Sequence, residues 1–256
     1  MLGYATESGD FNLPVDAITR KPTFAFSCNR RIRETYNGPL LKTVDGDVYP
    51  ADLENSKDKK VTKIYDQKIK HNCPSFDLFA TGDIFLRKKI GPYYYIEATA
   101  GAYFEFPATS FFTSDAGVLV VCDPSDINGR APVFSVSNIN NELCFDVGSA
   151  YMRFNHYKIS ERHQLFGGID SPDQEYNSYL GNFSEKTTIR NASGFSGVSL
   201  RKDPIDSDFT DGFIGRDASG NTFTGQIYEL IITNFEIPND SVNEAFEDMS
   251  EFYSLT

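Results

Sequence analysis

Tyr36-Asn37-Gly38-Pro39-Leu40 is the stretch from which the fold is best worked out, because its residues restrict the backbone in known ways. Proline cannot continue a helix and glycine tolerates the left-handed turn that ends one, so Gly38-Pro39 predicts a helix stop. The apolar residues before it recur at near-helical spacing with arginines between them, which predicts a helix over Phe24–Tyr36. Leu40-Leu41-Lys42-Thr43-Val44 then predicts a strand.

A second stretch, Lys63-Ile64-Tyr65-Asp66-Gln67, follows a charged segment and has Asn72 five residues after it. The many charges of Asp45–Lys60 predict a solvated loop, and Val61–Tyr65 predicts a second strand. The folded region is therefore expected to open with a helix, a strand, a loop and a strand.

From Tyr93 onward the pattern changes to short runs rich in Val, Ile, Phe and Tyr, separated by Gly, Pro, Asn and Asp. Many short strands with regular turn signals are typical of a sandwich or barrel. The predicted strands are Tyr93–Glu97, Ala102–Phe106, Gly117–Cys122, Pro132–Ser137, Glu142–Val147, Tyr151–Asn155, Gln164–Gly168, Tyr176–Leu180, Thr187–Ile189, Gly197–Arg201, Gly212–Gly215 and Gln226–Thr233. The fold class expected is all-β, an antiparallel β-sandwich of the jelly-roll kind.

The C-terminal end predicts an amphipathic helix. Ser241 and Glu244 have the spacing of a capping box. One stripe is apolar and the other acidic, and the apolar stripe is expected to pack on the sandwich rather than in a partner's groove. The apolar stripe consists of Val242, Ala245, Phe246, Met249, Phe252 and Tyr253.

The length and composition are those of one large β domain. The chain has 256 residues, 40% of them apolar, with 22 Phe, 14 Tyr and no Trp, so a sizeable core can form. No internal repeat or low-complexity linker divides it. We expect a polar N-terminal arm over residues 1–20, either loose or docked, and a single domain over residues 21–256.

The net charge of −12 and the pI of about 4.7 exclude nucleic acid as an expected partner, because a phosphate backbone would be repelled. The acidity serves solubility, or else binding to a basic surface or to calcium. Asp203, Asp206, Asp208 and Asp211 supply the hard oxygens that calcium prefers, without the spacing of an EF-hand. A solvated acidic loop is the preferred interpretation, and no other cofactor is expected.

Four cysteines, Cys28, Cys73, Cys122 and Cys144, show neither a CxxC pair nor zinc-site spacing with the histidines. The number of cysteines would allow two disulfides. The N-terminus has no signal-peptide pattern, so a cytosolic start and buried free thiols are expected. The longest apolar run, Ala116–Cys122, is too short to span a bilayer, and no membrane insertion is expected.

Three segments carry a family resemblance. Tyr36–Leu40, Lys63–Gln67 and Asn72, in this order, resemble the arabinofuranosidase-B catalytic domain, a branch of the concanavalin-A-like superfamily. Leu143–Ala150 is similar to that family's C-C-F-D-Y-G-N-A. Phe223–Asn234 resembles the last long strand of laminin-G-like and concanavalin-A-like domains, opened by F-x-G-x-I-x-E. The resemblance covers most of residues 24–253 and implies a concanavalin-A-like sandwich, a fold that related phage and bacterial proteins also carry.

Departures from the family pattern argue against its chemistry. The paired cysteine is Leu143-Cys144 here, Lys68-Ile69 replaces the family's Ser-Gly, and no Asp-Leu-Glu-Asn segment follows Ala150. The Asp-Leu-Glu-Asn string at residues 52–55 lies in the charged loop and is interpreted as coincidence. No serine-hydrolase elbow is present. A glycosidase would need a close carboxyl pair, and the carboxylates on predicted strands are Glu97, Glu105, Glu142, Asp146 and Glu229.

We therefore expect a noncatalytic sandwich with a structural or attachment role. A fold of extracellular type without an export signal suggests the surface of a phage virion, as a capsid decoration, head fibre or tail component. Other virion proteins, and glycans of the host surface, are the expected partners, in an oligomeric assembly. Tyr93, Tyr94 and Tyr95 are candidates for stacking on sugars, although a buried strand beside a turn at Gly91-Pro92 is the preferred interpretation. The alternatives are a glycoside hydrolase and a cellular lectin or adhesion domain.

Overall fold

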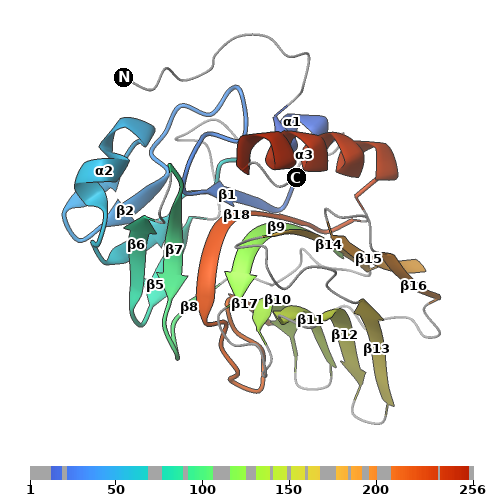
Figure 1. Ribbon diagram of the computed structural model, residues 1–256. Coiled ribbons are helices and arrows are strands. Elements are labelled where there is room, and N and C mark those ends of the chain that lie inside the picture. Colours follow the sequence, from blue (N-terminus) through green and yellow to red (C-terminus); the bar gives the residue numbers. More distant parts are fainter. Residues whose placement is uncertain are drawn as a thin grey trace.

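The structure is a computed structural model. It describes residues 13–18, 22–68, 77–88, 92–105, 116–124, 131–138, 141–148, 151–158, 161–167, 177–183, 186–191, 196–200, 209–235 and 237–253. Two antiparallel sheets pack face to face, and one long helix lies over the eight-stranded sheet (Figure 1). The predicted all-β sandwich is confirmed.

The two sheets are built from strands far apart in the sequence. Within the described ranges, the eight-stranded sheet has the order β16 (Ser196–Leu200), β15 (Lys186–Asn191), β14 (Asn177–Phe183), β9 (Ala116–Pro124), β18 (Gly225–Thr233), β7 (Tyr94–Ala98) and β6 (Ile84–Lys88), and β1 (Phe24–Ser27) also pairs with β18. The ten-stranded sheet has the order β13 (Glu161–Gly167), β12 (Tyr151–Lys158), β11 (Asn141–Gly148), β10 (Pro132–Ser137), β17 (Asp211–Ile214), β8 (Tyr103–Glu105), β5 (Leu78–Thr81), β4 (Val61–Ile64), β2 (Leu41–Thr43) and β3 (Gly46–Val48).

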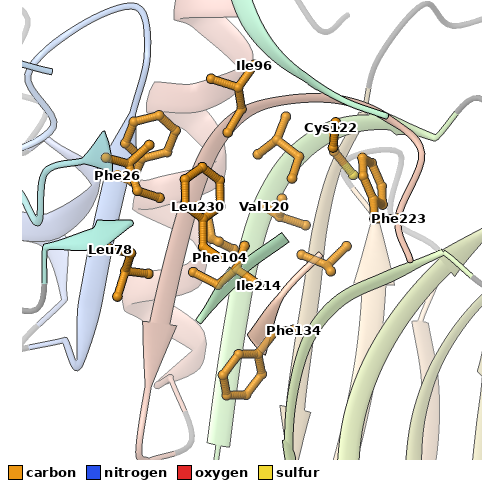
Figure 2. Packing of buried hydrophobic residues seen from close by; sticks show 14 of the residues in the cluster. Phe26, Leu78, Ile96, Phe104, Val120, Cys122, Phe134, Ile214, Phe223 and Leu230 are labelled. Carbon is orange, nitrogen blue, oxygen red and sulfur yellow. The ribbon is translucent and has the colours of Figure 1, made fainter. Parts of the chain in front are cut away.

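The main core lies between the sheets. Alternate residues of each strand point inward, as the two-residue period of a strand requires. Figure 2 shows Ile96, Val120 and Leu230 from the eight-stranded sheet meeting Phe104 and Ile214 from the ten-stranded sheet. These side chains are at most 2% exposed, so each strand's other face is the one left for further packing or for binding.

The helix predicted over Phe24–Tyr36 is wrong. Phe24–Ser27 forms strand β1, antiparallel to β18, and the chain then continues in bends and turns. Phe24, Phe26 and Cys28 also fit a two-residue period, and all three are buried in the main core. As a strand, this segment pairs with the stretch of β18 that extends beyond β7, whereas a helix would leave that edge of β18 unpaired.

The Lys63–Gln67 stretch fixes this opening segment in place. The buried Asp66 carboxylate accepts the Ala25 N–H at 3.2 Å and pairs with the buried Lys68 ammonium at 2.8 Å. The Gln67 side chain donates to Ser27 O at 2.7 Å and accepts from Ile32 N at 3.2 Å. These contacts join segments about forty positions apart in the chain, so the stretch is scaffold for β1.

Helix α3 (Asn239–Tyr253) covers the outer face of the eight-stranded sheet (Figure 1). It begins two residues before Ser241, so the predicted capping box lies inside the helix. The expected packing of its apolar stripe is confirmed, because Val242, Met249 and Tyr253 are fully buried in a second core cluster. Helix α1 (Pro14–Ala17) adds buried Val15 to this cluster, so residues 13–18 of the expected arm are docked.

A buried ionic network lies beneath α3. Arg30 binds the Glu229 carboxylate through two contacts of 3.2 Å and also pairs with Asp248 of α3. The Tyr253 hydroxyl donates to Glu229 at 3.1 Å. Burial raises the pKa of Glu229 despite the guanidinium beside it, and burial also raises the pKa of Tyr253. The network therefore fastens α3 to the sheet.

Some elements fall where none was predicted. The expected loop Asp45–Lys60 contains β3, the 3-10 turn η1 (Pro50–Asp52) and helix α2 (Leu53–Ser56), and β5 and β6 lie in a segment without predicted strands. Cys28, Cys122 and Cys144 are buried free thiols, as expected, and Cys73 lies outside the described residues. In the described part of the chain, no helix has the length and apolarity needed to cross a membrane.

Candidate functional site

The outer face of the ten-stranded sheet is the larger sheet surface that α3 does not cover. One line of outward-facing residues runs straight across the strands, and we call it the outer row: Lys42, Lys63, Phe79, Glu105, Phe213 and Ser135. Ala80 lies opposite Phe104, so the outward residues Phe79 and Glu105 on either side of that pair also face each other. Neighbouring strands are about 4.8 Å apart, which fixes the spacing along the row.

Phe79 is the most prominent member of the outer row. Its side chain is 68% exposed, more than any other large hydrophobic residue that the structure describes. The Lys63 ammonium lies 5.4 Å from the Phe79 ring centroid and 4.3 Å from that of Tyr65, and it pairs with Asp77 at 2.8 Å. An exposed aromatic ring thus lies near an ammonium group that Asp77 holds in place.

A second aromatic group lies two strands away. The Phe213 and Tyr103 rings meet edge to face with centroids 5.5 Å apart, and both are half-buried. The Arg216 guanidinium lies 4.8 Å from the Tyr103 centroid and 4.9 Å from that of Phe213. This stacking holds the rings and presents a cation beside them.

The turn over residues 215–222 closes the outer row beyond Phe213. Asp217 accepts hydrogen bonds from both the backbone and side-chain nitrogens of Asn221, which shapes the turn. Ser135 Oγ donates to Arg216 O at 2.7 Å, and Glu142 accepts from Ala218 N at 2.7 Å. Ser135 is fully buried as a result, and the accessible part of the outer row runs from Lys42 to Phe213.

The chemistry of this surface suits a polyhydroxylated ligand. Aromatic faces pack against the C–H face of a sugar, and carboxylates, ammonium groups and guanidinium groups exchange hydrogen bonds with hydroxyls. Glu105 lies between Phe79 and Phe213 along the row and is exposed. Few of these residues stood out in the sequence, since an aromatic residue on a strand usually belongs to the core.

The predicted sugar-stacking residues lie elsewhere. Tyr94 faces the main core and is 8% exposed, and its hydroxyl donates to Glu54 at 2.6 Å. Tyr93 and Tyr95 face α3: Tyr93 donates to Phe252 O at 2.6 Å, and the Tyr95 ring lies 5.6 Å from that of Tyr228. These placements fit the buried-strand interpretation, and a sugar-binding role for the three tyrosines stays a prediction.

The carboxylates proposed from the sequence divide between the two outer faces. Glu97, paired with Arg87 at 2.9 Å, and Glu229 lie on the eight-stranded sheet. Glu105, Glu142 and Asp146 lie on the ten-stranded sheet, where the fully buried Asp146 accepts the Ala131 N–H at 2.7 Å. Because Asp146 and Glu142 accept hydrogen bonds from backbone N–H groups, these two carboxylates have a structural role.

Residue Glu54, in the string at residues 52–55, is exposed in α2 at the sandwich edge. Hydrogen bonds from Lys57, Lys88 and Tyr94 lower the pKa of Glu54 to about 2. A carboxyl held in its ionised form by two ammonium groups serves as an ion-pair partner, which agrees with the interpretation of the string as a coincidence.

Of the four aspartates suggested as calcium ligands, Asp211 belongs to the described residues. Asp203, Asp206 and Asp208 lie outside them. Asp211 is exposed at the start of β17, and its carboxylate accepts from the Thr210 hydroxyl at 3.0 Å. In the part of the chain that the structure covers, His, Cys, Asp and Glu side chains form no group of three or more that could hold a metal.

No protein-family model matches the chain, and no curated protein matches its sequence. Solved structures resemble its fold. Domain 4 of a GH43 extracellular arabinanase from Geobacillus stearothermophilus, in complex with arabinotriose, aligns with a TM-score of 0.55 at 12% identity, over 88% of this chain and 98% of that one. An arabinofuranosidase complexed with arabinofuranosyl-α-1,2-xylobiose aligns with a TM-score of 0.64 at 13% identity, over 92% of this chain.

The chain spans 64% of the length of that arabinofuranosidase. A botulinum neurotoxin type C, whose cell entry depends on two ganglioside molecules, aligns with a TM-score of 0.55 at 8% identity, over 78% of this chain and 52% of that one. Identities this low establish the fold alone. The structural neighbours of this chain are therefore concanavalin-A-like β-sandwiches that include glycan-binding and glycoside hydrolase domains.

Proposed function

We propose that this chain is a noncatalytic glycan-binding β-sandwich that binds sugar through the accessible part of the outer row. One observation carries the proposal: Phe79 is 68% exposed at the centre of a row that also holds Lys63 and Glu105. Ligand sites combine aromatic side chains with a few polar groups that fix the orientation of the ligand, and Phe79 with Lys63 and Glu105 is such a combination. The sugar ligands of the structural neighbours support this choice.

The test is binding on a broad glycan array, followed by calorimetry with the best ligand. Phe79→Ala should weaken binding about tenfold, because a lost aromatic stack is worth roughly one power of ten in affinity. Val44→Ala is the matched control, since Val44 is also an exposed apolar residue, 60% exposed, but lies outside the row. Absence of any glycan ligand, or equal losses in the two variants, would contradict the proposal.

A glycoside hydrolase is the second candidate. Glu105 and Asp211 are both exposed on this face, from neighbouring strands β8 and β17, and they supply the two carboxyl groups that a glycosidase requires. Incubation of the purified protein with arabinan and arabinoxylan decides between the two. Sugar release that Glu105→Gln abolishes would replace the binding proposal with the catalytic one.

The setting proposed from the sequence is the surface of a phage virion, where glycan binding would serve attachment. Its support is the resemblance of Tyr36–Leu40 and Lys63–Gln67 to segments of related phage proteins, and the test is independent of ligand binding. Mass spectrometry of purified virions from the source should find the protein at a stoichiometry typical of a structural component. Its absence from virions, with secretion by a cell instead, would favour a cellular lectin.

A further inference from the structure

We propose that the outer row takes a linear, neutral oligosaccharide of at least three sugar units, laid across the strands, with Phe79 and Phe213 stacking on units that are not adjacent. The inference rests on the proposed glycan-binding function and adds the length, direction and charge of the ligand. It follows from the spacing of the two rings and from the groups that lie between and beside them.

The spacing sets the length. Phe79 on β5 and Phe213 on β17 are separated by one intervening strand, β8, as the order of the sheet shows (Figure 1). Two strand spacings amount to about 10 Å. A single pyranose or furanose ring is shorter than this gap, so one sugar cannot contact both rings. A chain with a middle unit over β8 can.

The direction follows from the register. Phe79, Glu105 and Phe213 lie opposite one another on successive strands, so the line that joins them runs across the sheet and not along a strand. Glu105 then faces the middle unit and can accept its hydroxyls. Arg216, stacked on Phe213, offers donors to the unit beside it.

The charges favour a neutral glycan. Glu105 lies between the two rings, and Asp77 already pairs with Lys63. Arg216 is flanked by the two rings. An acidic sugar over β8 would meet the Glu105 carboxylate at short range, and the chain's net charge of −12 repels polyanions as they approach.

One end of the row is closed and the other is open. The turn over residues 215–222 covers Ser135 beyond Phe213, whereas Lys63 and Lys42 continue the row toward the edge strand β3. Units beyond the third therefore reach polar side chains and no further ring. The main gain in affinity is expected when the chain grows from two units to three.

The experiment is calorimetric titration of the full chain with three neutral ladders of one to six units: arabino-, xylo- and cello-oligosaccharides. In the ladder that binds, affinity should rise about tenfold or more from the disaccharide to the trisaccharide and change little afterwards. Phe79→Ala and Phe213→Leu should each abolish that step, so that the trisaccharide binds no better than the disaccharide. Phe213→Leu keeps most of the volume of a half-buried side chain, and thermal unfolding checks that the variant is folded.

The outcomes separate this inference from the function on which it rests. Equal affinity for mono- and trisaccharides, or a step that survives Phe79→Ala, overturns the spanning ligand and leaves glycan binding intact. Tighter binding of oligogalacturonate than of every neutral ladder overturns the neutral ligand. No binding in any ladder and none on the glycan array overturns both.

Discussion

Replacing Arg30 with methionine tests whether the buried ionic network holds α3 to the sheet. Arg30 contacts Glu229, which is fully buried, and Asp248 of α3, and its guanidinium lies 4.1 Å from the Phe252 ring centroid. Methionine keeps much of the apolar packing of the arginine side chain but removes its charge and its hydrogen bonds to Glu229. Breaking a buried pair by removing one partner costs about 3–5 kcal/mol, because the other charge is left uncompensated.

The pH dependence gives a second, independent signature. The pKa of Glu229 is raised in the folded state, since burial outweighs the attraction of Arg30. Its contribution to stability is therefore complete below the ordinary carboxyl pKa of about 4.3 and is lost as the pH rises through the folded-state value. Removing Arg30 raises the folded-state pKa of Glu229 further, because the attraction of the guanidinium is the largest effect that lowers this pKa. The difference in stability between wild type and Arg30→Met should thus be about 3 kcal/mol at pH 7 and should narrow toward pH 5.

The assay is equilibrium denaturation in urea at pH 7 and pH 5, and Arg87→Met is the matched control. Arg87 also has two carboxylate partners, Glu97 and Asp58, and also lies over a phenylalanine ring, but its side chain is 33% exposed. An exposed network of this kind contributes about 0–1 kcal/mol. If Arg30→Met lost no more stability than Arg87→Met, or if its loss did not shrink at pH 5, the network would not be what holds the helix.

Three further predictions concern the scaffold and the site. Lys68→Met should lower the free energy of unfolding by about 3 kcal/mol, because Asp66 loses a buried ion-pair partner. The control Lys60→Met removes an exposed pair with Asp83 and should cost less than about 1 kcal/mol. Equal losses of the two variants in urea denaturation would contradict this prediction. Gly82→Ala should destabilise the fold by about 3 kcal/mol, because φ is +81° and a Cβ would lie 2.9 Å from Ala102 Cα, while Gly101→Ala, with φ +83° and no atom within 4 Å, should cost about 1 kcal/mol in the same measurement. Tyr93→Phe should lower the free energy of unfolding by about 1 kcal/mol, because the hydrogen bond to Phe252 O is lost, and should leave glycan affinity unchanged. A lower glycan affinity in calorimetry would instead place the sugar site at the tyrosines.

The strands after Tyr93 could be predicted because their signal is local. The run Pro132–Ser137 is rich in apolar and β-branched residues and ends at a turn residue, and β10 has those bounds. The opening segment could not be predicted in the same way. Phe24, Ala25 and Cys28 fit a helical spacing, and Phe24, Phe26 and Cys28 fit a strand equally well. Only the distant partner β18 decides between the two periods, and a single sequence does not show that pairing.

The candidate site was hidden for a related reason. Phe79 and Phe213 are 134 positions apart in the sequence, and only the strand order β5, β8, β17 brings them to within two strand spacings of each other. In the sequence each looks like a core residue, because phenylalanine is usually buried. The Tyr93-Tyr94-Tyr95 run drew attention because its members are consecutive, yet consecutive strand residues point to opposite faces and cannot form one platform.

Glu105 and Glu229 show what separates a binding surface from a structural one in this fold. Both are mid-sheet glutamates that point away from the main core, one on each sheet. Glu229 lies among apolar outward residues such as Tyr228 and Ile231, so α3 covers it, and Arg30 must then compensate its charge. Glu105 lies beside the exposed Phe79 ring, and near it lie Lys63 and Arg216, whose charges need water or a ligand and disfavour contact with an apolar helix. The composition of each outer face therefore decides which sheet receives the helix, and the face left open is the one equipped to bind.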